Sequence, residues 1–188
     1  GSKLDMDGNK SAGIFLWGGN VDVQDGTTLS ITGTGADAEQ GKYTGAICAY
    51  YYGADYRSHV TLADGAAVDL VKNPVGAINN GGEMYVGAGT TITGNGSNAE
   101  NGGGILNTGK VKVAAGARPY NNHAKISGDD IFNTAAGTDS SCGSIAFGAT
   151  GDDWQLDTEL GNCGHAIDGW YDDAAGSRWS AHGTEKHV

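Results

Sequence analysis

Small residues followed by isoleucine recur along this chain at intervals of 33, 31, 27 and 26 residues. The recurring positions are Ala12-Gly13-Ile14, Gly45-Ala46-Ile47, Gly76-Ala77-Ile78 and Gly103-Gly104-Ile105, and Ile131 continues the series. A repeat of this length is typical of solenoids, in which each unit buries its apolar face against its neighbours.

Two short strands with alternating apolar residues are expected after most of these anchors. The first set is Val21-Asp22-Val23, Val60-Thr61-Leu62, Met84-Tyr85-Val86, Val111-Lys112-Val113 and Ile145-Ala146-Phe147, and the second is Leu29-Ser30-Ile31-Thr32, Val68-Asp69-Leu70 and Thr91-Ile92-Thr93. A period of two places the apolar members on one face. Asp25-Gly26, Asp64-Gly65 and Ala88-Gly89 provide turns between the two sets.

Three short strands in each unit favour a coil over a sandwich of hairpins. Each strand then pairs in parallel with its counterpart in the next unit, and the anchor isoleucines form a column. We therefore predict an all-β fold, a single-stranded parallel β-helix (solenoid) of about five turns. Asn79, Asn80, Asn107 and Asn133 stand beside the anchors, where stacked amides would satisfy buried turn groups, or where they are ordinary surface turn residues.

The chain divides into three predicted regions. Residues 1–11 are a lead-in beginning with Gly1-Ser2, which looks like a cloning scar; residues 12–147 carry the repeats, and residues 148–188 form a C-terminal cap segment. The end of a parallel solenoid exposes unpaired backbone and core, so it needs a cover. The aromatic and cysteine residues expected in this cap are Trp154, Cys163, Trp170, Tyr171 and Trp179, with a ligand cage as the alternative role.

Composition and charge narrow the function classes. The 188 residues include 34 glycines and 2 prolines without a collagen period, and no apolar run long enough to insert into a membrane. The formal charge of −11 is spread along the chain with no basic stripe, which argues against nucleic acid as a partner.

An insertion in the second repeat is the best candidate for a contact surface. The step from anchor to next strand is 13 residues from Ile47 to Val60, against 6 from Ile78 to Met84. The ligand-binding candidates in this insertion are Tyr50, Tyr51, Tyr52, Tyr56, Arg57 and His59. Tyr and Arg dominate recognition hot spots, and flat aromatic faces suit sugar rings. The alternative is a tyrosine-rich strand that merely covers the side of the solenoid.

The cysteine and acidic residues indicate no cofactor. The sequence leaves open whether Cys142 and Cys163 form a disulfide. Cys163, His165, His182 and His187 are zinc-type donors without a known finger spacing. The pairs Asp5/Asp7, Asp129/Asp130, Asp152/Asp153 and Asp172/Asp173 could offer oxygen ligands to calcium, but solvated turns are the favoured interpretation. Cys48, beside Ile47, is expected to be a buried small hydrophobe.

The stretch Thr90-Thr91-Ile92-Thr93-Gly94-Asn95, followed by Gly102-Gly103-Gly104-Ile105-Leu106-Asn107, resembles the repeat of bacterial adhesin-like right-handed β-helix proteins, including polymorphic outer-membrane proteins. The segment around Ile167-Asp168-Gly169-Trp170-Tyr171 is similar to closing segments of large cell-wall-anchored proteins of gut bacteria. The resemblance implies a right-handed coil and an extracellular place on the bacterial cell surface, within a larger secreted protein.

Three functions remain open at this point. The leading expectation is a non-catalytic cell-adhesion or interaction module that binds a host glycan or a host surface or secreted protein. The second is a structural stalk or spacer. The third is a polysaccharide-degrading enzyme, which is disfavoured because Arg57, Arg118 and Arg178 lie in three different regions and no nucleophile or phosphate motif occurs. The sequence leaves the oligomeric state open.

Overall fold

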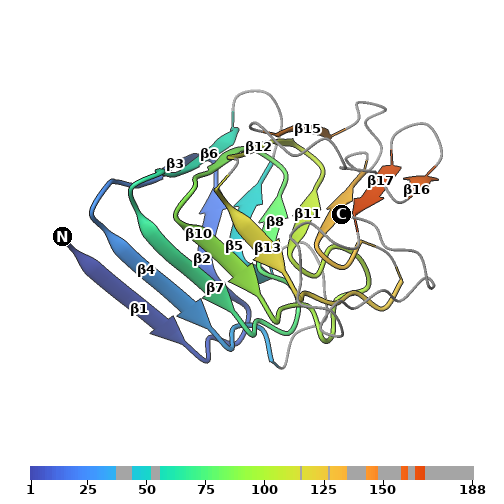
Figure 1. Cartoon of the computed structure of the whole chain (residues 1–188), viewed down its shortest axis with the longest axis horizontal. Helices are drawn as coiled ribbons and strands as arrows, with labels where there is room; N and C mark the ends of the chain where they lie inside the picture. The colour runs from blue at the N-terminus through green and yellow to red at the C-terminus, as the bar shows by residue number, and fades with distance from the viewer. Residues whose placement is uncertain are drawn as a thin grey trace.

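A computed structural model describes residues 1–36, 44–51, 56–114, 116–126, 128–134, 143–147, 158–160 and 164–167. Within these residues the fold is all-β, with 17 strands and no helix (Figure 1). None of these residues forms a helix that could span a membrane.

The strands form three sheets. Sheet A contains β1 (Lys3–Asp7), β4 (Thr28–Thr32), β7 (Ala67–Val71), β10 (Thr90–Thr93) and β13 (Arg118–Tyr120). Sheet B contains β2 (Ala12–Trp17), β5 (Gly45–Tyr50), β8 (Ile78–Asn80), β11 (Ile105–Asn107), β14 (Ile131–Asn133), β17 (Gly164–Ile167) and β16 (Thr158–Leu160). Sheet C contains β3 (Gly19–Val23), β6 (Ser58–Leu62), β9 (Glu83–Val86), β12 (Lys110–Val113) and β15 (Ser144–Phe147).

The chain visits sheets A, B and C in rotation from β1 to β15, and each strand from β1 to β12 pairs in parallel with the strand three places later in the order. Figure 1 shows the result as a stack with β1 at one end and β16 and β17 at the other. This topology is consistent with a β-helix-like solenoid, because hairpins would pair consecutive strands. Only β17 pairs antiparallel, with β14 and with β16, among the named strands.

The anchor isoleucines are in register across sheet B, as predicted. Ile14 pairs with Ile47, Ile47 with Ile78, Ile78 with Ile105 and Ile105 with Ile131. The four later members are at most 1% exposed and belong to one core cluster. Burying an aliphatic side chain of this size contributes roughly 1.5–3 kcal/mol, so the column is a main source of stability.

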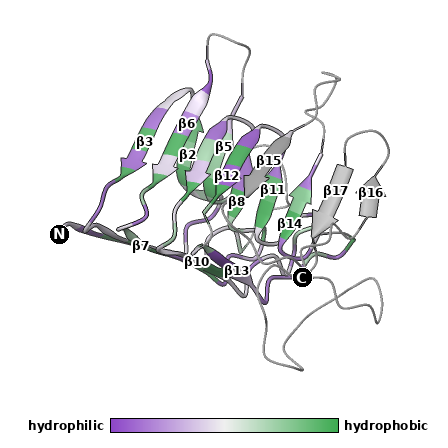
Figure 2. Ribbon diagram, turned by 45° about the horizontal axis from the view of Figure 1, so that its top comes forward, coloured by the Kyte–Doolittle hydropathy of each residue, from purple (hydrophilic) through white to green (hydrophobic). Residues whose placement is uncertain are grey.

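The other two predicted sets of strands complete the core. Sheet C aligns Val21, Val60, Met84 and Val111 in one row, and sheet A aligns Ile31, Leu70 and Ile92. Figure 2 shows hydrophobic residues recurring on successive strands, with hydrophilic residues at strand ends and in turns. Two strands of sheet A were not expected from the sequence: β1, in the segment interpreted as a lead-in, and β13.

An asparagine ladder runs along one corner of the stack. The Asn80 Nδ2 donates to Asn107 Oδ1 at 2.7 Å, and the Asn107 Nδ2 donates to Asn133 Oδ1 at 2.6 Å. All three residues are buried, which confirms the predicted stacking for them. Asn79 lies instead in register with Leu106, one position away from the ladder.

A second ladder, not predicted from the sequence, follows the strands of sheet A. Asn73 donates through Nδ2 to Asn95 Oδ1 at 2.9 Å, Asn95 to Asn122 Oδ1 at 2.8 Å, and Asn122 to Asp130 Oδ1 at 2.7 Å. The residue before each of its asparagines has a positive φ: 54° at Lys72, 65° at Gly94 and 52° at Asn121. This left-handed residue turns the chain so that the next amide enters the core, and it explains the Gly-Asn pair at residues 94–95.

Candidate functional site

The inserted segment between β5 and β6 leaves and rejoins the stack at one place. Tyr51 and Arg57 form an antiparallel bridge at its base. The guanidinium carbon of Arg57 lies 5.5 Å from the centroid of the Tyr51 ring, a cation–π distance. Tyr52, also a predicted ligand residue, lies outside the described residues.

An aromatic strip continues from this bridge onto β2. It comprises Phe15, Trp17, Tyr50 and Tyr51. Trp17 is in register with Tyr50, with ring centroids 5.2 Å apart, and the Phe15 and Trp17 rings meet edge to face at 6.2 Å. Trp17 is 47% exposed and Phe15 41%. Tyr56 is 60% exposed, and its backbone runs beside Gly18, directly after Trp17.

Phe15 and Trp17 were not predicted from the sequence as residues of the site. The signal was present in the spacing, because Trp17 precedes Tyr50 by the same 33 residues that separate Ile14 from Ile47. In parallel strands of equal register, equal spacing brings both pairs side by side.

Ser58 holds the strip and the inserted segment together. Its buried hydroxyl lies 2.8 Å from the Tyr50 carbonyl oxygen and 3.3 Å from that of Leu16, and it accepts the N–H of Gly18 at 3.0 Å. One side chain therefore ties the ends of β2 and β5 to the start of β6. Since Arg57 immediately precedes Ser58, this contact also places the guanidinium against Tyr51.

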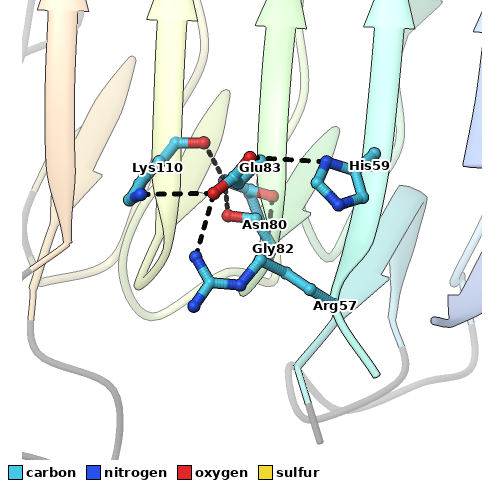
Figure 3. A network of polar contacts seen from close by, with 6 residues as sticks. All are labelled: Arg57, His59, Asn80, Gly82, Glu83 and Lys110. Atoms are coloured by element: carbon cyan, nitrogen blue, oxygen red, sulfur yellow. Dashed lines mark hydrogen bonds and ion pairs between the residues drawn. The ribbon is translucent and has the colours of Figure 1, made fainter. Parts of the chain in front are cut away.

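Glu83 on β9 contacts three basic side chains, those of Arg57, His59 and Lys110 (Figure 3). Its Oε1 lies 2.9 Å from Arg57 Nη1 and 3.2 Å from Lys110 Nζ, and its Oε2 lies 3.4 Å from His59 Nδ1. The hydrogen bonds from Lys110 and then from Arg57 lower the pKa of Glu83 below its ordinary value, so the carboxylate is charged at neutral pH. We call Arg57, His59, Glu83 and Lys110 the charged row.

Parallel register explains why the charged row assembles. His59 pairs with Glu83 across β6 and β9, and Glu83 pairs with Lys110 across β9 and β12. Arg57 and His59 were predicted from the sequence as residues of the site, whereas Lys110 and Glu83 were not. Predicting their meeting would have required the register of three units.

A second polar cluster lies further along the same face of sheet C. Asp64 Oδ1 accepts the Ala88 N–H at 2.9 Å and the Tyr85 hydroxyl at 2.8 Å. These two hydrogen bonds lower the pKa of Asp64, and the one from Ala88 has the larger effect. The hydrogen bond to Asp64 raises the pKa of Tyr85. Lys112 Nζ lies 5.6 Å from the Tyr85 ring centroid.

The acidic pair Asp129 and Asp130 corrects one expectation. These residues were interpreted as a solvated turn, but they are 0% and 1% exposed. Asp129 Oδ1 accepts the Ala124 N–H at 2.7 Å, and Asp130 Oδ1 accepts from the Asn122 side chain at the end of the second ladder. Their carboxylates accept hydrogen bonds from a backbone N–H and a side-chain amide. A buried donor needs such an acceptor within the protein, because it is out of reach of solvent.

The described residues contain no group of three His, Cys, Asp or Glu side chains that could hold a metal ion. Cys48 is buried, as predicted, and burial raises its pKa to about 12, which keeps it a thiol rather than a nucleophilic thiolate. The residues of the candidate disulfide and of the predicted cap, and three of the four candidate zinc donors, lie outside the described residues. They are Cys142, Cys163, Trp154, Trp170, Tyr171, Trp179, His182 and His187.

Comparisons with protein-family models, with curated proteins and with solved structures find no significant match to this chain.

Proposed function

We propose that this protein is a non-catalytic interaction module that binds an extracellular glycan or protein through the aromatic strip and Arg57. The observation that carries this proposal is the contact on the surface between Trp17 and Tyr50, whose ring centroids lie 5.2 Å apart. Large aromatic side chains grouped on a surface mark interaction sites, because their exposure has no benefit for folding.

The strip has the composition of a recognition hot spot. Trp, Tyr and Arg bury large areas with few rotatable bonds, so little entropy is lost when a ligand covers them. Ser58 and the Tyr51–Arg57 bridge hold the strip in place before a ligand arrives. Such preorganisation raises affinity by removing the entropy cost of ordering the site.

The setting that we propose is the bacterial cell surface, as part of a larger secreted, cell-wall-anchored protein, and host glycans or proteins are the proposed partners. The support is the resemblance of the Gly-Gly-Ile-x-Asn repeats to adhesin-like proteins. We further propose a right-handed coil of about five turns, because crossovers between parallel strands are almost always right-handed. The cap proposed for residues 148–188 would cover the last turn.

The experiment is binding of the purified protein to a glycan array and to a panel of purified host surface proteins. The double variant Trp17→Ala/Tyr50→Ala should lose the binding, while Leu4→Ala should retain it. Leu4 is a suitable control because it is also 47% exposed but lies on sheet A. Binding that survives the double variant would rule out the strip as the site.

A structural spacer is the second candidate, and the two asparagine ladders favour it. Internal hydrogen bonds that run along the stack stiffen it along its axis, which is the property that a spacer requires. The same array separates the candidates, because a spacer would bind none of the glycans or proteins.

A further inference from the structure

We propose that the ligand of the aromatic strip is an anionic saccharide, whose carboxylate or sulfate is bound by Arg57 and Lys110 while a sugar ring lies on Trp17 and Tyr50. This inference rests on the proposed function and specifies its ligand class. The observation behind it is the charged row, where the guanidinium of Arg57, the ammonium of Lys110 and the imidazole of His59 surround the carboxylate of Glu83.

The charged row has an excess of positive charge. Glu83 offsets one cation, which leaves +1 with His59 neutral and +2 with His59 protonated, in a chain whose formal charge is −11. The basic side chains of the charged row are accessible, since those of Arg57, His59 and Lys110 are 34%, 49% and 64% exposed. A local positive site on an acidic protein is a position at which an anion is favoured.

The neighbouring row on sheet C has no such excess. Lys112 lies over Tyr85, which donates to Asp64, so each sign of charge is represented there once. On β3 the continuing positions are Asn20 and Asp22, which add no cation. The excess is therefore confined to the charged row, next to the strip.

The small positive charge of the charged row determines which kind of anion can bind there. The acidic background repels extended polyanions such as nucleic acids, whose affinity depends on many phosphate contacts. A ligand with one anionic group on each sugar or disaccharide would place a single charge at the charged row. Arg57 connects the two parts, because its guanidinium contacts both Tyr51 and Glu83. Planar guanidinium donors match the geometry of a carboxylate or sulfate.

The test measures affinities by calorimetry at fixed salt for matched pairs of oligosaccharides. The acids are hyaluronan, chondroitin, galacturonan and mannuronan hexasaccharides, and each is compared with its methyl ester, which keeps the rings and removes the carboxylate charge. A chondroitin 4-sulfate hexasaccharide with its carboxylates methyl-esterified covers the sulfate source, and its neutral partner is the same methyl ester after desulfation. A glutamate-rich decapeptide serves as a protein-like anion.

Three variants locate the charge effect. Lys110→Ala should weaken binding of the acid about fivefold, the scale expected for one charge about 4 Å away in water, and leave the neutral partner unchanged. Glu83→Gln should strengthen acid binding by a similar factor, whereas a purely structural role for Glu83 would weaken both. Lys3→Ala is the control, because its side chain is 67% exposed on sheet A.

The outcomes separate this inference from the proposed function. Preference for the charged member of at least one pair, lost in Lys110→Ala, supports the inference. If both members of every pair bind equally and the binding still requires Trp17, the inference is overturned but the proposed function is retained. Tighter binding of the decapeptide than of any saccharide has the same two consequences. Absence of any Trp17-dependent binding to these probes, to the array or to the protein panel overturns both.

Discussion

The Nδ2 of Asn95 donates to the Oδ1 of Asn122 at 2.8 Å, between residues that are each 1% exposed. Asn95 Nδ2 also donates to the Leu70 carbonyl at 2.9 Å, and Asn95 Oδ1 accepts the Asn73 N–H at 2.9 Å. One side chain thus satisfies two backbone groups at the end of β7 and in the turn after it, in a place that water does not reach.

Asn95→Ala should therefore lower the free energy of unfolding by about 3 kcal/mol, because it leaves a buried donor and a buried acceptor without partners. Urea denaturation followed by circular dichroism measures the change. Asn20→Ala, at an exposed position of β3, should stay within about 0.5 kcal/mol of the parent protein. Equal effects of the two substitutions would contradict a structural role for the second ladder.

Lys72 offers a substitution that should stabilise the protein. Its φ of 54° lies in the left-handed region, at the corner position that glycine occupies as Gly33 and Gly94, with φ of 64° and 65°. Lys72→Gly should raise the free energy of unfolding by about 0.5–1 kcal/mol, since the relieved strain exceeds the added chain entropy. Asp69→Gly, within β7, should lower stability by about the same amount, and thermal melting of both variants checks the difference in sign.

The isoleucine column should respond according to depth in the stack. Ile105 is 0% exposed and lies between Ile78 and Ile131. Ile105→Ala should lower the free energy of unfolding by about 2–5 kcal/mol. Ile14 is only partly buried against the core, on the edge strand β2 of sheet B, so Ile14→Ala should cost less. A larger loss from Ile14→Ala in denaturant unfolding would disagree with the register of sheet B.

Ser58 should affect binding without contacting the ligand. Ser58→Ala removes the acceptor for the Gly18 N–H and the donor near the Tyr50 carbonyl, which loosens the aromatic strip. We expect the affinity for any ligand that requires Trp17 to fall about 5-fold to 30-fold, equivalent to roughly 1–2 kcal/mol. Ser30→Ala, on β4 of sheet A, is the control, and unchanged binding in Ser58→Ala would show that the strip does not depend on this hydroxyl.

The pair Asp64 and Tyr85 predicts a dependence on pH. Its hydrogen bond raises the pKa of Tyr85, so this contribution to stability is complete below the ordinary value of 10.0 and is lost as the pH rises through the folded-state pKa. Spectrophotometric titration, with Tyr85→Phe subtracted to isolate this phenol, should show a lower midpoint in Asp64→Asn. An unchanged midpoint would mean that the bond does not persist in solution.

At acid pH the same pair acts in the opposite direction. The bonds from Ala88 and Tyr85 lower the pKa of Asp64, so the stability they contribute is present above the ordinary value of 3.8 and is lost as the pH falls through the lowered one. The denaturation midpoint of the parent protein should therefore fall more steeply below pH 4 than that of Asp64→Asn.

Residue spacing was sufficient to predict most of the strands and their parallel stacking, but not β1 and β13, because apolar alternation and the recurring isoleucines are local properties of the chain. The same periodicity placed Ile47 beside Ile78 and Asn80 beside Asn107, since residues at equivalent places in successive units share a register. Tyr51 and Arg57 were recognisable as candidates because the insertion interrupts an otherwise regular repeat.

The partners of those candidates depended on three-dimensional stacking. Lys110 reaches Glu83 because β12 lies in register beside β9, and Arg57 reaches both Glu83 and Tyr51 because the Tyr51–Arg57 bridge brings it back to the stack before β6 begins. The burial of Asp130 was also not predictable, since an exposed acidic turn and a buried acidic hydrogen-bond acceptor have the same sequence pattern. Local pattern encodes which face of a strand is apolar, whereas the meeting of charged side chains from different units is decided by how loops of unequal length return to one register.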